Sequence, residues 1–254
     1  MIIAIDVGNT NIDIAFFQGY KLVKHFELST NNSATSYEYA LNLSWLLENN
    51  QLGCDDIEGI ALASVVPPVT LELERAVKYL FGLKPFIVAP GIKTGIIIDV
   101  ENPKEVGSDL ICNAVALIED YKTSGVVVDF GTAITVLGVR DRKMLGVAIA
   151  PGIWTASSAL WEKAARLSSV DLFTPPESVL GKNTVTAMQS GIIYGFVGLV
   201  DKLVSLELEE MKTDPFVIAT GGWAERIAKY CQSINLIDPY LTLKGLCRLY
   251  MKNI

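Results

Sequence analysis

One pattern occurs twice in this chain: an apolar β-branched run that ends in Asp-x-Gly and continues with amide or hydroxyl residues. The first copy is IIAIDVGNT at residues 2–10, and the second is VVVDFGTAIT at residues 126–135. Both runs predict buried strands. Because the residues after the glycine also correspond, the repeat indicates a duplication rather than two buried strands that happen to end alike. The corresponding pairs, at one constant offset, are Asp6 and Asp129, Gly8 and Gly131, and Asn9 and Thr132.

The residue types in this pattern suit a phosphate-bearing ligand. A glycine lets the backbone turn tightly and lets a ligand approach closely. The hydroxyls of Thr132 and Thr135 are hydrogen-bond donors, and an Asp at a strand end can hold a metal ion, because hard cations take oxygen ligands. We therefore expect one phosphate-and-metal loop in each half of the chain.

Composition narrows the class of protein. The chain has 254 residues, of which 50% are apolar and 19% charged, as in a compact protein with a sizeable core. A net charge of −7 argues against nucleic-acid binding, which needs a basic face. The apolar runs fall short of the roughly 18 residues of a membrane span, and the first residues show no basic leader. We expect a cytoplasmic protein.

The cysteines and the single histidine exclude several kinds of site. His25 lies in a strand-like stretch, where a surface or packing role is expected, so a Ser-His-Asp hydrolase and a His-rich zinc site are disfavoured. The cysteines have no metal-ligand spacing and are expected to be reduced thiols. They are Cys54, Cys112, Cys231 and Cys247.

Strand-like and helical segments alternate along the chain, which predicts an α/β fold. Three strands open the chain at residues 2–28, and three more at 126–149 repeat that opening. Neither GxxxxGK[ST] nor GxGxxG occurs, which disfavours a P-loop or a Rossmann site. A third glycine loop, at residues 220–222, follows an apolar run and suits a nucleotide or a tight strand-to-helix turn equally well. Helical spacing is found at residues 37–49, 70–81, 111–121, 154–167, 184–211 and 242–251.

Two Asp-Gly loops and a Gly-Gly turn on duplicated three-strand openings resemble the actin-like ATPase and sugar kinase architecture. That architecture implies two ribonuclease H-like halves, residues 1–118 and 119–254, with a nucleotide cleft between them. Further motifs resemble one family closely and in the right order, the type III pantothenate kinase (Bvg accessory factor-like) family. They are DVGNTN at 6–11, NP and VGSD at 102–109, DFGTA at 129–133, GVAIAPG at 146–152, GKNT and AMQSG at 181–191, ATGG at 219–222 and LTLKGL at 241–246.

The resemblance implies ATP-dependent phosphorylation of pantothenate to 4'-phosphopantothenate, the first step of coenzyme A biosynthesis. It also implies a homodimer, Mg²⁺ and a monovalent cation, K⁺ or NH₄⁺. The general base would be Asp109, the monovalent-cation ligand Asp129, and Asp6 would help to hold Mg²⁺ through the phosphates. The implied ATP-binding residues are Asp6, Val7, Gly8, Asn9, Thr10, Asn11, Ile12, Asp13, Thr132, Gly221 and Gly222, and the implied pantothenate-binding residues are Val100, Gly107, Ser108, Asp109, Leu110 and Thr184.

One departure from the family pattern leaves two hypotheses open. The family usually has Gly-x-Asp-Arg, whereas Leu110 follows Asp109 here. A missing guanidinium removes a charged, forked donor, unless Arg140, Arg142 or Arg166 compensates. The first hypothesis is an active pantothenate kinase. The alternative is a non-catalytic relative that binds nucleotide or a pantothenate-like ligand. Without the resemblance, Asp109 itself would be interpreted as a helix-terminal acid that satisfies backbone N–H groups.

Overall fold

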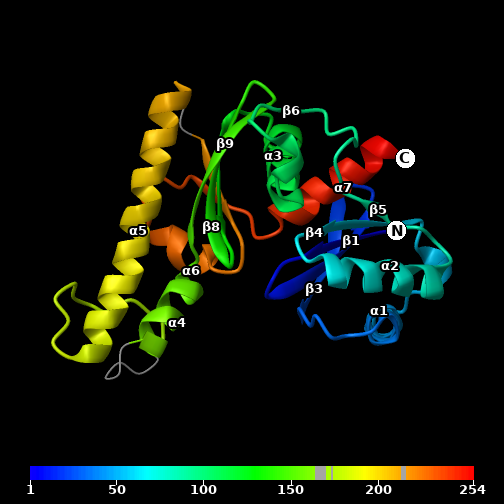
Figure 1. The fold of residues 1–254 in the computed structure, drawn as a ribbon, viewed down its shortest axis with the longest axis horizontal. Helices are drawn as coiled ribbons and strands as arrows, with labels where there is room; N and C mark the ends of the chain where they lie inside the picture. Colours follow the sequence, from blue (N-terminus) through cyan, green and yellow to red (C-terminus); the bar gives the residue numbers. More distant parts are fainter. Residues whose placement is uncertain (164–169, 173, 213–215) are drawn as a thin grey trace. The chain divides into compact units, whose positions relative to one another are not determined.

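The computed structural model describes residues 1–163, 170–172, 174–212 and 216–254 (Figure 1). The chain forms two compact units. The first contains residues 1–96, 101–121 and 241–254, and the second contains residues 97–100 and 122–240. The expected division of the duplicated halves between residues 118 and 119 stays a prediction. Arg166, one of the arginines considered above, lies outside the described residues.

The first unit is built on a five-stranded sheet in the order β3-β2-β1-β4-β5. The first three strands form the expected antiparallel opening, and β4 and β5 continue it in parallel. The central strands β1 and β4 are almost wholly buried, as their continuous apolar runs require. The bounds are β1 Ile2–Val7, β2 Asn11–Gln18, β3 Lys21–Ser29, β4 Gly59–Ser64 and β5 Phe86–Ile87.

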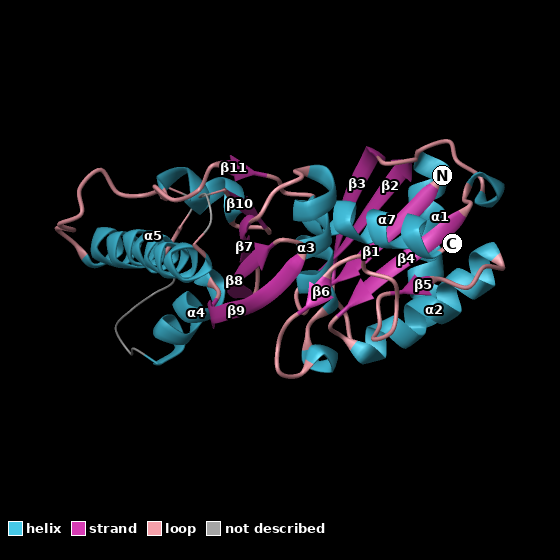
Figure 2. Cartoon of the chain, turned by 90° about the horizontal axis from the view of Figure 1, so that it is seen from above, coloured by secondary structure: helices cyan, strands magenta, loops and turns pink. Residues whose placement is uncertain are grey.

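Helices α1, α2, α3 and α7 cover this sheet (Figure 2). Helices α1 (Ser36–Asn49) and α2 (Pro67–Phe81) pack their leucines and valines against the strand face that carries Ile3 and Ile5. Helices α3 (Ser108–Asp120) and α7 (Leu241–Asn253) pack against each other, and α7 also contacts β1. The core of the unit is therefore the sheet sandwiched between two helix layers.

Helix α3 is held along its length by α7. A Cβ on Gly245 would lie 1.9 Å from the carbonyl oxygen of Cys112, so the two helix backbones meet there and only glycine fits. Thr242 Oγ1 donates to the amide oxygen of Asn113 at 2.8 Å. Near the end of α3, the Arg248 guanidinium pairs with the Asp120 carboxylate. The body of α3 is thus fixed independently of its first turn.

The second unit repeats the three-strand opening in a six-stranded sheet, ordered β11-β10-β7-β8-β9-β6. Strands β7, β8 and β9 are consecutive and antiparallel, as the repeat predicted, and β10 lies parallel to β7. The strands are β6 Ile97–Ile98, β7 Gly125–Phe130, β8 Ala133–Arg140, β9 Lys143–Pro151, β10 Val217–Thr220 and β11 Leu236–Ile237, and the helices are α4 Ile153–Lys163, α5 Thr184–Met211 and α6 Ala224–Ile227.

Several bounds differ from the expected ones. Helix α3 begins at Ser108, three residues before the first residue expected, because its first turn is polar and lacks the apolar spacing that marks a helix. Residues 91–102, whose sequence predicts an extended loop or edge segment, contain the short strand β6 at the edge of the second sheet, in agreement with that prediction. Residues 223–231, for which the sequence predicts one further helix, divide into α6 and a 3₁₀ turn at Ala228–Tyr230. The helix expected at 154–167 is described only as far as Lys163.

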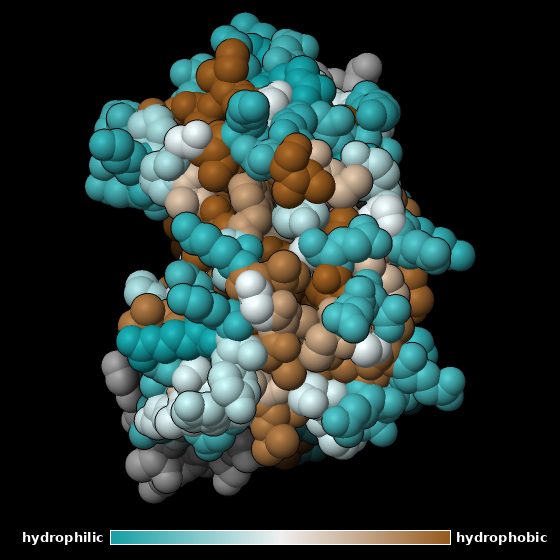
Figure 3. Space-filling model, turned by 90° about the vertical axis from the view of Figure 1, so that its right-hand side faces the viewer, coloured by the Kyte–Doolittle hydropathy of each residue, from teal (hydrophilic) through white to brown (hydrophobic). Residues whose placement is uncertain are grey.

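Two exposed aromatic rings contact each other on the surface of the first unit. Tyr37 of α1 and Tyr79 of α2 are exposed, and their rings meet edge to face with centroids 5.2 Å apart. On the face seen in Figure 3, brown apolar residues interrupt the teal hydrophilic surface. None of the helices in the described ranges combines the length and apolar composition needed to cross a lipid bilayer.

Candidate active site

The first Asp-Gly loop connects β1 to β2 and is closed by its own backbone. The Gly8 N–H donates to the carbonyl oxygen of Asn11 at 2.9 Å. Thr30 ties the loop to β3, because its hydroxyl donates to the Gly8 carbonyl at 2.7 Å and its N–H to the Thr10 carbonyl at 2.8 Å. Asn9 and Thr10 are exposed at the tip of the loop. These exposed groups and the backbone are what the loop can offer to a ligand.

The side chains of Val7 and Ile12, both placed in the implied ATP-binding set, are fully buried in the core. A ligand at this loop can meet only their backbone. Asp6 and Asp13 are half-buried and lie directly opposite each other in the β1–β2 ladder. Like charges at such a position repel. His25 lies close to Asp13, with Nε2 2.7 Å from Oδ1, so the histidine has a structural partner rather than a catalytic one.

Asp109 lies in the first turn of α3, where a carboxylate is favoured by the helix dipole. Its Oδ1 folds back over Gly107, where a Cβ would come within 2.3 Å. Burial raises the pKa of Asp109, and N–H groups of Leu110 and of Asp109 itself partly offset that rise. Burial raises the pKa of the Cys112 thiol, and the Asp6 and Asp109 carboxylates raise it further. Ser108, directly before Asp109, is hydrogen-bonded to Ser64, which pairs in register with Val7, directly after Asp6, so the first turn of α3 lies beside the end of β1.

The residues on either side of Asp109 are buried. Ser108 and Leu110 are only 8% and 7% exposed. The Leu110 side chain packs into the interior, so an arginine at this position would begin in an apolar environment rather than facing a substrate. Leu110 contributes its backbone N–H to the site instead. Val100, implied to contact pantothenate, belongs to the second unit.

The second Asp-Gly loop connects β7 to β8 and is held by the start of α4. The Gly131 N–H donates to the Ala133 carbonyl at 3.1 Å. The carbonyl of Thr132 accepts from the Gly152 N–H at 3.1 Å and from the Thr155 hydroxyl at 2.8 Å. A Cβ on Gly152 would lie 2.4 Å from two carbonyl oxygens of the loop. Gly152 therefore shapes this loop, although no role was assigned to it from the sequence beyond its place in a family motif.

The Gly-Gly turn after β10 lies against the second loop. Gly221 has φ +89°, and a Cβ there would lie 2.3 Å from Oδ1 of Asp129. The preceding residue, Thr220, pairs in register with Asp129 and is 1% exposed. Its hydroxyl oxygen has no hydrogen-bond partner in the described part of the chain. A buried oxygen of this kind beside a carboxylate is a candidate ligand for a cation.

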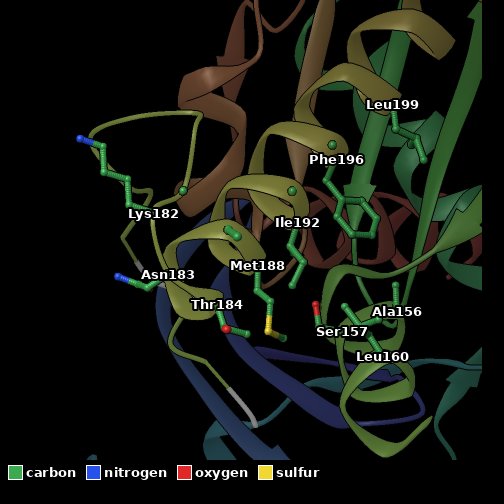
Figure 4. A pocket seen from close by; sticks show the side chains of 14 residues that line it. Ala156, Ser157, Leu160, Lys182, Asn183, Thr184, Met188, Ile192, Phe196 and Leu199 are labelled. Atoms are coloured by element: carbon green, nitrogen blue, oxygen red, sulfur yellow. The ribbon is translucent and has the colours of Figure 1, made fainter. Parts of the chain in front are cut away.

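Thr184 lies elsewhere in the second unit, at the first residue of α5. Asn183 caps the helix by accepting from the Thr186 N–H at 2.9 Å. Thr184 is exposed and lines a hollow of about 900 Å³ between α4 and α5 (Figure 4). The hollow contains no described residue of either Asp-Gly loop. Its side chains, labelled in Figure 4, include Met188, Ile192, Phe196 and Leu199 of α5 and Ala156, Ser157 and Leu160 of α4.

Metal ions would be held here by few protein groups. Over the described ranges, no three His, Cys, Asp or Glu side chains cluster as a metal centre. One carboxylate on each loop, Asp6 and Asp129, suits Mg²⁺ that is held mainly by substrate phosphates, or a monovalent cation that takes hydroxyl and backbone oxygens as well. Together, the duplicated sheets and their Asp-Gly loops define a fold of the actin-like ATPase class.

Comparison with known proteins gives the family. Residues 2–206 match the family described as type III pantothenate kinase. A type III pantothenate kinase of Dictyoglomus turgidum is 55% identical over 256 residues and is covered completely, as is this chain. One from Bacillus cytotoxicus is 47% identical over 254 residues, covering 100% of this chain and 97% of that protein. The chain belongs to the type III pantothenate kinase family.

A solved structure supports the fold independently. A Campylobacter jejuni protein described as a Baf family transcriptional activator superposes with a TM-score of 0.61, covering 99% of this chain and 98% of that chain. At 21% identity this likeness concerns the fold alone. The curated relatives are named as kinases, which supports the first of the two hypotheses rather than the non-catalytic alternative.

Proposed function

We propose that the chain transfers the γ-phosphoryl group of ATP to the primary hydroxyl of pantothenate, with Asp109 as the general base. One observation carries the assignment of the base. Asp109 is a partly buried carboxylate at the N-terminus of α3, and the residue before it, Ser108, is hydrogen-bonded to Ser64 beside the end of β1. Phosphoryl transfer requires an oriented hydroxyl and neutralised phosphate charge, and a carboxylate can orient the hydroxyl without a histidine.

In the proposed reaction the substrate hydroxyl gives its proton to the Asp109 carboxylate. The alkoxide-like oxygen forms a bond to the γ-phosphorus as the bond from that phosphorus to the β,γ-bridging oxygen breaks, and ADP leaves with the electron pair. The raised pKa of Asp109 makes this carboxylate a stronger base than an exposed aspartate. The Leu110 N–H, which donates to the carboxylate, holds the group in place.

Each Asp-Gly loop is proposed to offer groups that bind the nucleotide or a cation. Asn9, Thr10 and Thr132 offer exposed polar side chains, and Gly222 is accessible for close backbone approach. A bound Mg²⁺ would supply positive charge to the phosphates. Asp6 suits it, because an added cation relieves the repulsion between Asp6 and the opposing Asp13.

The proposed monovalent-cation site uses Asp129 and Thr220. The buried Thr220 hydroxyl oxygen lacks a partner in the described residues, and Thr220 pairs in register with Asp129, so the two offer the oxygen ligands that a K⁺ or NH₄⁺ ion takes. Such an ion would add positive charge beside the second loop.

Coupled measurement of ADP release tests the proposed function. With ATP, Mg²⁺ and K⁺, we expect turnover that requires pantothenate. Replacing K⁺ with tetramethylammonium at constant ionic strength should reduce the rate to background, because that ion is too bulky for oxygen ligands beside Asp129. Absence of pantothenate-dependent ADP release under all these conditions would support the non-catalytic alternative. Equal rates in the two salts would remove the cation role of Asp129.

The hollow between α4 and α5 supports the proposed homodimer. Gly191, Gly195 and Gly198 form an exposed row on α5, and a Cβ on any of them would meet nothing within 4 Å. Such a row lets another helix approach closely, and the apolar lining of the adjacent hollow favours burial. A second copy of the chain, bringing its own α5, is the occupant we propose for this surface.

Light scattering on the wild-type protein should give about twice the chain mass of 27.6 kDa. Gly195→Leu fits the open space of a single chain and improves helix propensity, so it should preserve the fold while blocking close approach. We expect a mass near that of one chain for this variant. A variant that remains dimeric would place the interface elsewhere, and a monomeric wild type would exclude the homodimer.

The cysteines support the proposed cytoplasmic location. All four are free, and burial raises the pKa values of Cys231 and Cys247 to about 12, so these thiols stay protonated and unreactive. Free thiols persist in a reducing compartment. The expected absence of nucleic-acid binding stays a prediction that follows from the net charge of −7.

A further inference from the structure

A buried hydroxyl joins the first turn of α3 to the end of β4. Ser108 Oγ accepts the Ser64 N–H at 2.9 Å and donates to the Ser64 carbonyl at 3.1 Å. Ser64 is the last residue of β4 and pairs in register with Val7 of β1, next to Asp6. The serine side chain thus occupies both backbone groups of a residue beside the first loop.

The side chain of Ser64 extends the same network into α2. Its Oγ accepts from the Val66 N–H at 3.0 Å and from the Thr70 hydroxyl at 2.7 Å. Thr70 Oγ1 lies 3.1 Å from the Val66 carbonyl as well. The three residues Thr70, Ser64 and Ser108, called the hydroxyl cluster below, link α2, β4 and α3 through hydrogen bonds that are half-buried or buried.

The Ser108 hydroxyl does not serve its own helix. Gly107 is the N-cap of α3 and has no side chain that could cap the helix, and Ser108 is the first helical residue. A serine hydroxyl near a helix start usually satisfies N–H groups of the same helix. Over the described residues its hydrogen bonds go to Ser64 of β4, which indicates a role in placing the helix end relative to the sheet.

We propose that the hydroxyl cluster positions the Asp109 carboxylate against the first Asp-Gly loop for proton transfer. Ser108 is the residue directly before Asp109, and Ala63, directly before Ser64, pairs in register with Asp6. The body of α3 is held separately by the contacts of Gly245 and Thr242. Loss of the cluster therefore loosens the first turn, which carries Asp109, and leaves the rest of the helix in place. The inference rests on the proposed role of Asp109.

Thr70 offers a matched pair of variants outside the catalytic and binding residues. Thr70→Val removes the hydroxyl and keeps the shape, whereas Thr70→Ser keeps the hydroxyl. We expect kcat to fall about threefold to tenfold in Thr70→Val and to recover in Thr70→Ser, with the KM for ATP unchanged, because a small displacement of a reacting group lowers the rate steeply. Ser108→Ala, which breaks both bonds to Ser64, should lower kcat by about 10-fold to 100-fold.

A double-mutant cycle separates positioning from general structural support. If the cluster acts through Asp109, Ser108→Ala should not lower the residual single-turnover rate of Asp109→Asn any further. Equal fold losses in the wild-type and Asp109→Asn backgrounds would overturn the inference. The thermal midpoint of every variant is measured beside the rate, and the Thr70 pair decides the question if Ser108→Ala does not fold. Equal kcat values in Thr70→Val and Thr70→Ser would then overturn the positioning role of the hydroxyl cluster.

The same data distinguish the failure of this inference from that of the proposed function. Full activity of Ser108→Ala beside an inactive Asp109→Asn would overturn the positioning role alone. Retention of kcat by Asp109→Asn would instead remove Asp109 as the base, and the positioning role with it.

Discussion

Asp109→Asn is expected to lower kcat by about 10²- to 10⁴-fold, the range typical of a lost general base. The amide keeps the shape of the carboxyl group over Gly107 but cannot accept the hydroxyl proton. ATP binding should be nearly unchanged, because the nucleotide is proposed to bind the two loops. ADP release with saturating pantothenate measures kcat, and nucleotide titration measures binding. A variant that retains most of its kcat would show that Asp109 is not the base.

A matched control removes a carboxylate elsewhere. Asp55→Asn changes an exposed acid in the 3₁₀ turn Cys54–Asp56, so kcat should stay at the wild-type value.

The stabilities of the wild type and Asp109→Asn should also differ in a defined direction. Because the folded-state pKa of Asp109 is raised, ionisation of this group opposes folding, and stability falls as pH rises through that pKa. Asp109→Asn should therefore be slightly more stable than the wild type at neutral pH.

The raised pKa also sets the acid limb of the pH–rate profile. The carboxylate is the active form, so the rate should fall as pH drops through the pKa of Asp109. Burial places that midpoint above the ordinary aspartate value of about 3.9. A profile measured across the acid range should show this limb in the wild type and in Asp55→Asn. The residual rate of Asp109→Asn should lack it.

The sequence predicted most of what local patterns determine. Buried apolar runs indicated β1 and β7, and the repeated Asp-x-Gly indicated both loops and the duplicated three-strand openings. The start of α3 was expected too late, because Ser108 and Asp109 carry no apolar periodicity. The consequence matters for the site, since the true start places Asp109 in the first helical turn.

Contacts between distant segments could not be predicted from the sequence. Ser64 and Ser108 are 44 residues apart, and nothing around Ser64 except the following prolines sets it apart from any strand-end serine. The pairing of Thr220 with Asp129 likewise depends on which strands become neighbours. Burial is also a non-local property. Leu110 was read as a departure at a substrate-facing position, whereas its side chain packs inward.

Gly221 is the position where an added methyl group should be most damaging to the second loop. Its φ of +89° is a conformation that side chains with a Cβ rarely adopt. The Cβ of an alanine would also lie 2.3 Å from Asp129 Oδ1 and 2.8 Å from backbone atoms of Phe130. The backbone of Phe130 cannot give way easily, because its carbonyl accepts from the Trp223 N–H at 3.2 Å and its side chain is fully buried.

We therefore expect Gly221→Ala to destabilise the protein by about 2–4 kcal/mol and to lower the thermal midpoint by several degrees. The displaced Asp129 carboxylate should also raise the K⁺ concentration needed for half-maximal activity, which a K⁺ titration of ADP release measures. Gly146→Ala in β9 is the matched control, because its Cβ would meet nothing within 4 Å. A Gly221→Ala protein with the stability and K⁺ dependence of Gly146→Ala would show that the turn and Asp129 are not in contact. If Gly221→Ala is less stable but its K⁺ dependence is unchanged, the backbone strain at position 221 does not affect the cation site.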